Sequence, residues 1–167
     1  MKKLLLLCLL ILPASSCIAQ VLSVDQLLSI YNKDEEQIDA YLGARGWERT
    51  SSVDPKSIKT WAYDKQIDPF SVGGTEPGLK YQAKGWFSLV NDEEGYWLSY
   101  SISSKERFVA IRQRIIAMGM KRVSYTSDND MTVATYQGTR YAIRLVTIID
   151  GDNSGENNYS LKLAVKN

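Results

Sequence analysis

The sequence predicts an α+β domain in which helices pack on one face of an antiparallel sheet. Apolar residues recur at helical spacing in short stretches that end near Gly46 and Gly119. Strand-like alternation of apolar and polar residues follows each glycine, without a further helix between the strands. Consecutive strands joined by short links pair antiparallel. Because this order occurs twice, we predict two similar α-β-β-β halves, residues 23–102 and 103–167.

The clearest predicted helix begins at Ser103. Ser103 and Glu106 have the spacing of a capping box, in which each side chain satisfies a backbone amide of the other residue's turn. Apolar residues then recur at helical spacing: Phe108, Ile111, Ile115 and Met118. Gly119 readily takes the left-handed conformation that ends a helix. Both ends of this amphipathic helix are therefore marked.

Two shorter helices are predicted in the first half. Residues 23–26 and 32–35 both have capping-box spacing, and Gly43 with Gly46 ends the second helix. Three strands are expected after the glycine in each half, at 57–64, 80–84 and 96–102, and at 130–137, 140–144 and 159–165. Corresponding positions include Ile38 with Ile111 and Tyr63 with Tyr136. An internal duplication explains them, and coincidental patterning is the alternative.

Residues 1–19 are predicted to be a secretory signal peptide. Two lysines precede the apolar run 4–12, and small residues follow it. That run is shorter than the ~20 residues of a membrane span, so no retained span is expected. Cleavage after Ala19 leaves residues 20–167 as a single domain in the periplasm or outside the cell. The alternative is an outer-envelope lipoprotein with its lipid anchor at Cys17.

The composition excludes several kinds of function. The formal net charge is +1, so nucleic acid is not an expected partner. The chain has no histidine, and its two cysteines lie within the first 17 residues. Ser–His and Cys–His catalysis and the usual zinc sites are therefore excluded from the domain, and no metal or cofactor is expected. The loop 150–155 has part of a calcium-loop pattern, but Leu161 stands where its last carboxylate belongs.

Carboxylate chemistry is the remaining catalytic alternative. Acidic residues cluster at 92–94 and at Asp128 with Asp130. Both clusters fall in predicted turns, where such side chains commonly bond to the local backbone. We therefore expect no enzyme, with a carboxylate-based hydrolase as the less favoured alternative.

Aromatic and basic residues are expected on the sheet face away from the helices. Within 96–102 the alternation places Trp97, Ser99 and Ser101 on one face, opposite the larger apolar side chains. The same alternation assigns Lys84 and Trp86 to this face, together with Arg144 and Lys162. An alternative is that Trp86 and Trp97 pack across strands on each other and on lysine stems.

A long segment, residues 65–79, interrupts the first half. It contains Pro69 and Pro77 but no helix or strand pattern, which is typical of a functional or disordered loop. We therefore predict a partner-binding site that comprises this loop and the sheet face. Its candidate residues are Trp86, Trp97, Lys84, Arg144, Lys162, Pro69 and Pro77.

The predicted element order resembles the β-lactamase inhibitor protein family. The resemblance covers residues 23–165 in layout only, and the disulfides of that family have no counterpart here. It implies that an aromatic-rich sheet face binds a partner enzyme. The expected function is thus an exported, non-catalytic module that binds a protein partner in an inhibitor- or immunity-like role. The alternative is a protein that binds carbohydrate or the cell envelope, since tryptophans also stack on sugar rings.

Overall fold

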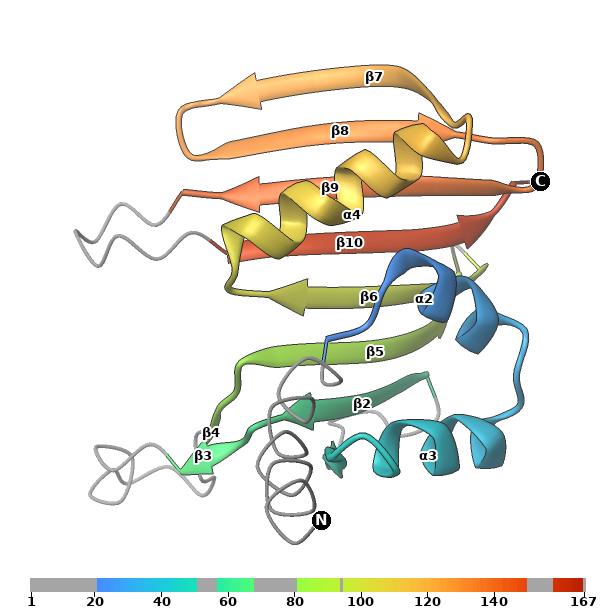
Figure 1. Ribbon diagram of the computed structural model, residues 1–167, viewed down its shortest axis with the longest axis vertical. Coiled ribbons are helices and arrows are strands. Elements are labelled where there is room, and N and C mark those ends of the chain that lie inside the picture. The colour runs from blue at the N-terminus through green and yellow to red at the C-terminus, as the bar shows by residue number, and fades with distance from the viewer. Residues whose placement is uncertain (1–20, 51–56, 68–80, 94, 150–157, 167) are drawn as a thin grey trace, which may run out of the picture.

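The computed structural model describes residues 21–50, 57–67, 81–93, 95–149 and 158–166. Within them, three helices lie on one face of an eight-stranded antiparallel sheet (Figure 1). The helices are α2 (Val24–Tyr31), α3 (Glu35–Gly43) and α4 (Lys105–Ala117). The strands of the sheet are β1 (Trp47–Thr50), β2 (Ile58–Tyr63), β5 (Gly85–Asp92), β6 (Gly95–Ile102), β7 (Lys121–Asp128), β8 (Met131–Gln137), β9 (Tyr141–Ile148) and β10 (Asn158–Val165). The predicted α+β class and antiparallel sheet are confirmed.

The two halves of the chain meet at the centre of the sheet. The strand order is β1-β2-β5-β6-β10-β9-β8-β7, so the last strand of each half, β6 and β10, pair with each other. Each half supplies four strands to this sheet, one more than the sequence predicted. The missed strands are β1 and β7, which form the two edges. All eight residues of β7 are exposed, and only two of them, Val123 and Tyr125, are large apolar residues, which is too few to mark a strand.

The expected strand at 80–84 is replaced by a different arrangement. β4 (Tyr81–Gln82) pairs with β3 (Gln66–Ile67) in a separate two-stranded sheet. The strand that enters the main sheet, β5, begins only at Gly85 and pairs with β2 and β6. Residues 1–20, 68–80 and 150–157 lie outside the described residues. The signal peptide, Cys17, Pro69, Pro77 and the loop 150–155 therefore stay predictions.

The helix ends agree in part with the predicted caps. Ser23 and Gln26 form the expected capping box at the start of α2. α4 begins one residue later than predicted, because Ser104 is its N-cap and accepts a hydrogen bond from the amide of Arg107. Likewise Asp34, two residues beyond the predicted position, caps α3. Gly119 does have the left-handed conformation, with φ +78°.

The core lies between the helices and the sheet. The helices bury aliphatic side chains against it: Leu27, Ile30, Ile38, Leu42, Ile111 and Ile115. The strands bury Trp61, Phe87, Leu98, Tyr100, Tyr136, Ile143, Leu161 and Leu163. Full burial of one such aliphatic side chain stabilises the fold by roughly 1.5–3 kcal/mol. Met118, which was expected in this stripe, is 37% exposed because α4 has already ended there.

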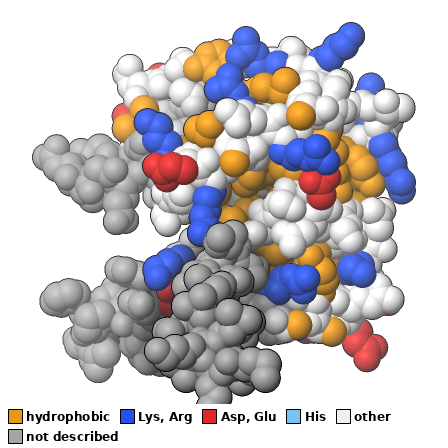
Figure 2. All heavy atoms as spheres, viewed as in Figure 1, with side chains coloured by type: hydrophobic (Ala, Val, Ile, Leu, Met, Phe, Trp, Pro, Cys, Tyr) orange, Lys and Arg blue, Asp and Glu red, His pale blue; other side chains and the backbone are white. Residues whose placement is uncertain are grey.

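The outer surface of the helical layer carries many cations. Figure 2 shows Lys and Arg side chains spread over this side, with hydrophobic side chains between them. Arg114 of α4 donates to both carboxylate oxygens of Asp25 of α2, at 2.8 and 2.9 Å, and so links the two halves. Arg112 donates to the hydroxyl of Tyr136 on β8 at 3.1 Å. No helix of the described residues is long and apolar enough to cross a membrane.

Candidate functional site

The open face is defined as the side of the sheet away from α2, α3 and α4. Burial on β6 shows the two faces directly: Leu98, Tyr100 and Ile102 are buried under the helices, and the residues between them are half-buried. β10 repeats this pattern, with Lys162 between two buried leucines. Register with these strands then places Trp86, Trp97, Arg144 and Lys162 on the open face, where the alternation predicted them.

Two cations lie side by side in the middle of the open face. Lys162 of β10 is directly opposite Arg144 of β9 on one side and Ser99 of β6 on the other. This row continues with uncharged hydroxyl side chains: Ser88, Thr60 and Thr50 in one direction, and Thr135 and Ser124 in the other. Like charges placed directly opposite are unfavourable. The other residues of this row are all uncharged, so Arg144 and Lys162 are its only cations and lie next to each other.

Trp97 lies beside this cationic pair. It is opposite Val90 and Ala164, and the ammonium nitrogen of Lys162 lies 3.8 Å from the centroid of its ring. That distance is well within cation–π range. Trp97 is half-buried, so part of its indole stays accessible on the open face.

Trp86 lies on the same face, but away from Trp97. Its partners in the register are Ala62 of β2 and Ser101 of β6, whereas Trp97 precedes Ser101 on β6 by four residues. Four residues of strand span about 13 Å. The register therefore does not pair the two indoles with each other. The alternative prediction was that the two tryptophans pack on each other and on lysine side chains. The structure contains one of these contacts, between Lys162 and Trp97.

Lys84 does not belong to the open face. It precedes the first residue of β5, and its side chain lines a cavity on the helix-bearing side of the sheet. Its ammonium group bonds to the carboxylate of Asp64 at 2.5 Å, and this hydrogen bond raises the pKa of Lys84. Lys84 was assigned to the open face by extending the alternation of β5 to residues before Gly85. The strand begins only at Gly85, and the chain bends at Lys84. Pro69 and Pro77, the loop residues of the predicted site, are outside the described residues.

The two acidic clusters lie far apart. Asp92 ends β5 and Glu93 follows it, at the end of the sheet where β6 begins, whereas Asp128 and Asp130 lie at the turn between β7 and β8, beside the other end. Glu94 lies outside the described residues. Paired carboxylates of glycosidases are about 5–9.5 Å apart, much less than the length of these strands. Asp128 accepts a hydrogen bond from the amide of Asn129 at 2.8 Å, as expected of a turn residue. Among the described residues, no three His, Cys, Asp or Glu side chains gather to hold a metal ion.

Some residues of the open face were not predicted. Thr60 lies opposite Ser88, with their hydroxyl oxygens 3.1 Å apart, and Val90 lies beside Trp97. Alternation had assigned Ser88 to this face, but Thr60 and Val90 were not considered.

Comparison of the chain with protein-family models, with curated proteins and with solved structures gave no match.

Proposed function

We propose that this chain is an exported, non-catalytic module that binds a protein partner through the open face. The partner presents acidic side chains to Arg144 and Lys162 and an apolar surface to Trp86 and Trp97. An inhibitor- or immunity-like role, as the resemblance to β-lactamase inhibitor proteins implies, belongs to this proposal.

The observation that carries the proposal is the composition of the face around Trp97. Two tryptophans and two cations share a sheet surface whose other central residues are short hydroxyl or small apolar side chains. Tryptophan and arginine are the residues in which interfaces concentrate binding energy. Short neighbours allow another backbone to approach closely, so the larger residues act as anchors.

Carbohydrate binding is favoured less by this geometry. A sugar ring stacks on a freely exposed aromatic face, and the ammonium group of Lys162 already covers one face of Trp97. Lys162 and Arg144 also suit an acidic partner better than a neutral glycan. Binding of the protein to purified envelope glycans, rather than to another protein, is therefore the outcome that favours this alternative.

Site-specific photo-cross-linking tests the proposal. A benzophenone amino acid is placed at Ser99, in the centre of the open face, and in a control at Gln113, on the exposed side of α4. Both proteins are expressed in the producing cell and illuminated. We expect a discrete cross-linked protein from position 99 and none from position 113. Cross-linking from position 113 alone overturns the assignment of the open face.

Substitution of the anchors provides the quantitative test. We expect Trp86→Ser and Trp97→Ser to abolish capture of the cross-linked protein, while each changes the free energy of unfolding by about 1 kcal/mol. Tyr125→Ser, on the exposed edge strand β7, is the matched control and should leave capture unchanged. If the tryptophan variants lose several kcal/mol but retain capture, the indoles are structural residues and the proposal is wrong.

A further inference from the structure

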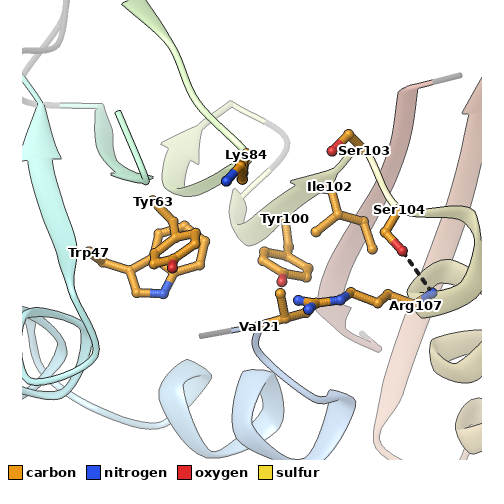
Figure 3. Close-up of a pocket in the computed structure, with 10 residues that line it drawn as sticks. Val21, Trp47, Tyr63, Lys84, Tyr100, Ile102, Ser103, Ser104 and Arg107 are labelled. Carbon is orange, nitrogen blue, oxygen red and sulfur yellow. Dashed lines mark hydrogen bonds between the residues drawn. The ribbon is translucent and has the colours of Figure 1, made fainter. Parts of the chain in front are cut away.

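A cavity of about 400 Å³ lies on the helix-bearing side of the sheet, separate from the open face. Figure 3 shows Trp47 and Tyr63 together on one side of it and Tyr100, Val21 and Arg107 on the other. Cavities of 300–1,000 Å³ are the usual size of small-molecule sites.

The cavity exists because one row of the sheet lacks a side chain. Trp47, Tyr63, Gly85 and Ile102 are successive partners across β1, β2, β5 and β6, and all four line the cavity. A Cβ atom on Gly85 would lie 3.2 Å from Cη2 of Trp47, closer than ordinary van der Waals contact. Gly85 thus leaves the floor of the cavity open and allows the Trp47 indole to extend over it.

Trp47, which lines the cavity, carries a buried hydrogen-bond donor. The residue is 3% exposed, and its indole nitrogen has no hydrogen-bond partner among the residues that the structure describes. In Figure 3 that nitrogen lies on the edge of the ring turned toward Val21 and Tyr100. The other deeply buried indole, Trp61, donates to Asp39 at 2.7 Å. Buried donors are rarely left without an acceptor, so the Trp47 N–H calls for one from a ligand.

The charges at the rim indicate the kind of ligand. Arg107, in the first turn of α4, forms no ion pair with the described residues, and its charge acts on the neighbouring hydroxyl of Tyr100. Lys84 adds a second cation, although Asp64 pairs with it. None of the described residues that line the cavity carries a carboxylate. The rings of Tyr63 and Tyr100 supply apolar walls.

From these features we infer that the cavity binds a small organic anion with a flat apolar body, such as an aromatic carboxylate. The body lies between the tyrosine rings, an acceptor atom of the ligand takes the Trp47 N–H, and the anionic group lies near Arg107. This site is independent of protein binding through the open face, which is on the other side of the sheet.

Nuclear magnetic resonance of the indole N–H groups tests the inference. The processed, ¹⁵N-labelled protein is titrated with indole-3-acetate, and Trp47→Phe identifies the Trp47 signal. We expect a saturable downfield shift of that signal, with the Trp61 signal unmoved because its N–H already bonds to Asp39. Indole-3-acetamide, which has the same body without the charge, should bind roughly fivefold or more weakly.

Two arginines of α4 provide a matched pair of variants. Arg107→Gln should weaken indole-3-acetate by roughly fivefold or more. Arg112→Gln should leave its affinity unchanged, because Arg112 bonds to Tyr136 away from the cavity. A Trp47 signal that does not move at millimolar indole-3-acetate overturns the site. If the wild-type protein binds indole-3-acetate and indole-3-acetamide equally well, the inference that the cavity selects an anion is wrong. This comparison needs no variant, so it holds even if a variant misfolds.

Discussion

Lys162 and Trp97 are diagonal neighbours on β10 and β6, and the lysine ammonium nitrogen lies 3.8 Å from the centroid of the indole. Lys162 is also directly opposite Arg144. The same ammonium group therefore has a favourable interaction with an aromatic ring and an unfavourable one with a guanidinium. These two interactions have opposite signs, so they can be measured separately.

The favourable interaction is measured by a double-mutant cycle. We expect Lys162→Met and Trp97→Leu to show a coupling free energy of about 0.5–1 kcal/mol that stabilises the native state. Urea unfolding of the wild type, the two single variants and the double variant gives this quantity. Lys121→Met with Trp97→Leu is the control cycle, since Lys121 lies on edge strand β7, four strands away from β6, and its coupling should be near zero. A zero coupling for Lys162 would show that the contact contributes nothing to stability.

The unfavourable interaction predicts that Arg144→Ser stabilises the isolated protein. Removal of one of two opposed cations should raise the free energy of unfolding by about 0.2–1 kcal/mol in low salt. Salt screens such exposed charges, so the gain should shrink at about 1 M sodium chloride. Urea unfolding at both salt concentrations measures the change. The proposed function adds that the same variant binds its partner more weakly, and stabilisation with unchanged binding would separate Arg144 from the interface.

The sequence predicted features that depend on short-range patterns. The faces of β6 followed from simple alternation, and the end of α4 followed from Gly119, the residue that most readily takes positive φ. Edge strand β7 was not recognised, because both of its faces are exposed and it contains only two large apolar residues, Val123 and Tyr125. β1 is too short, at four residues, to show a period.

The features that were missed at the sites depend on tertiary contacts. Lys84 does not lie on the open face, because the chain bends before Gly85. The amide of Lys84 bonds there to the carbonyl of Tyr63 at 3.0 Å. The capping-box spacing selected Ser103, but the hydroxyl that accepts the amide of Arg107 and caps α4 belongs to Ser104. The cavity beside Trp47 needed the register of four strands, which no local pattern contains. The internal duplication stays a prediction.

Asp39 is expected to stabilise the fold through the buried indole of Trp61. One carboxylate oxygen accepts from the Trp61 N–H at 2.7 Å, and the other accepts from Arg49 at 2.9 Å. Trp61 is 1% exposed, so Asp39→Ala leaves a buried donor unsatisfied and should cost about 1–3 kcal/mol. Glu36→Ala, at an exposed position of the same helix, should cost less than about 1 kcal/mol. Urea midpoints compare the two, and equal losses would contradict this role.

Tyr100 makes stability depend on alkaline pH. Burial raises the pKa of Tyr100 to about 12, from 10.0. Below pH 10 the hydroxyl is neutral in both the folded and the unfolded chain, so its stabilisation is fully present. Between the two pKa values only the unfolded chain loses the proton, and stability falls by about 1.4 kcal/mol per pH unit, or about 3 kcal/mol in all.

Tyr100→Phe isolates this effect. At neutral pH the variant should be less stable by about 1–3 kcal/mol, because the amide of Leu22 donates to the Tyr100 hydroxyl at 3.1 Å and loses its acceptor. The difference from the wild type should shrink as the pH rises toward 12, since only the wild type carries the titrating group. Urea unfolding across this range gives the comparison. A difference that stays constant would mean that the Tyr100 hydroxyl ionises equally in both states.

Gly119 and Gly43 should respond oppositely to alanine. Gly119 has φ +78° and follows α4. Its amide bonds to the carbonyl of Ile116, and the amide of Met120 bonds to the carbonyl of Ile115. An alanine there meets no neighbouring atom but is strained by the left-handed backbone, so Gly119→Ala should cost about 1–2 kcal/mol.

Gly43 is the last residue of α3, also has open space around it and needs no positive φ. Gly43→Ala should therefore stabilise the protein by about 0.4–1 kcal/mol, through the reduced entropy of the unfolded chain. Thermal unfolding of both variants measures these changes, and destabilisation of both by the same amount would show that crowding, rather than backbone conformation, decides the outcome.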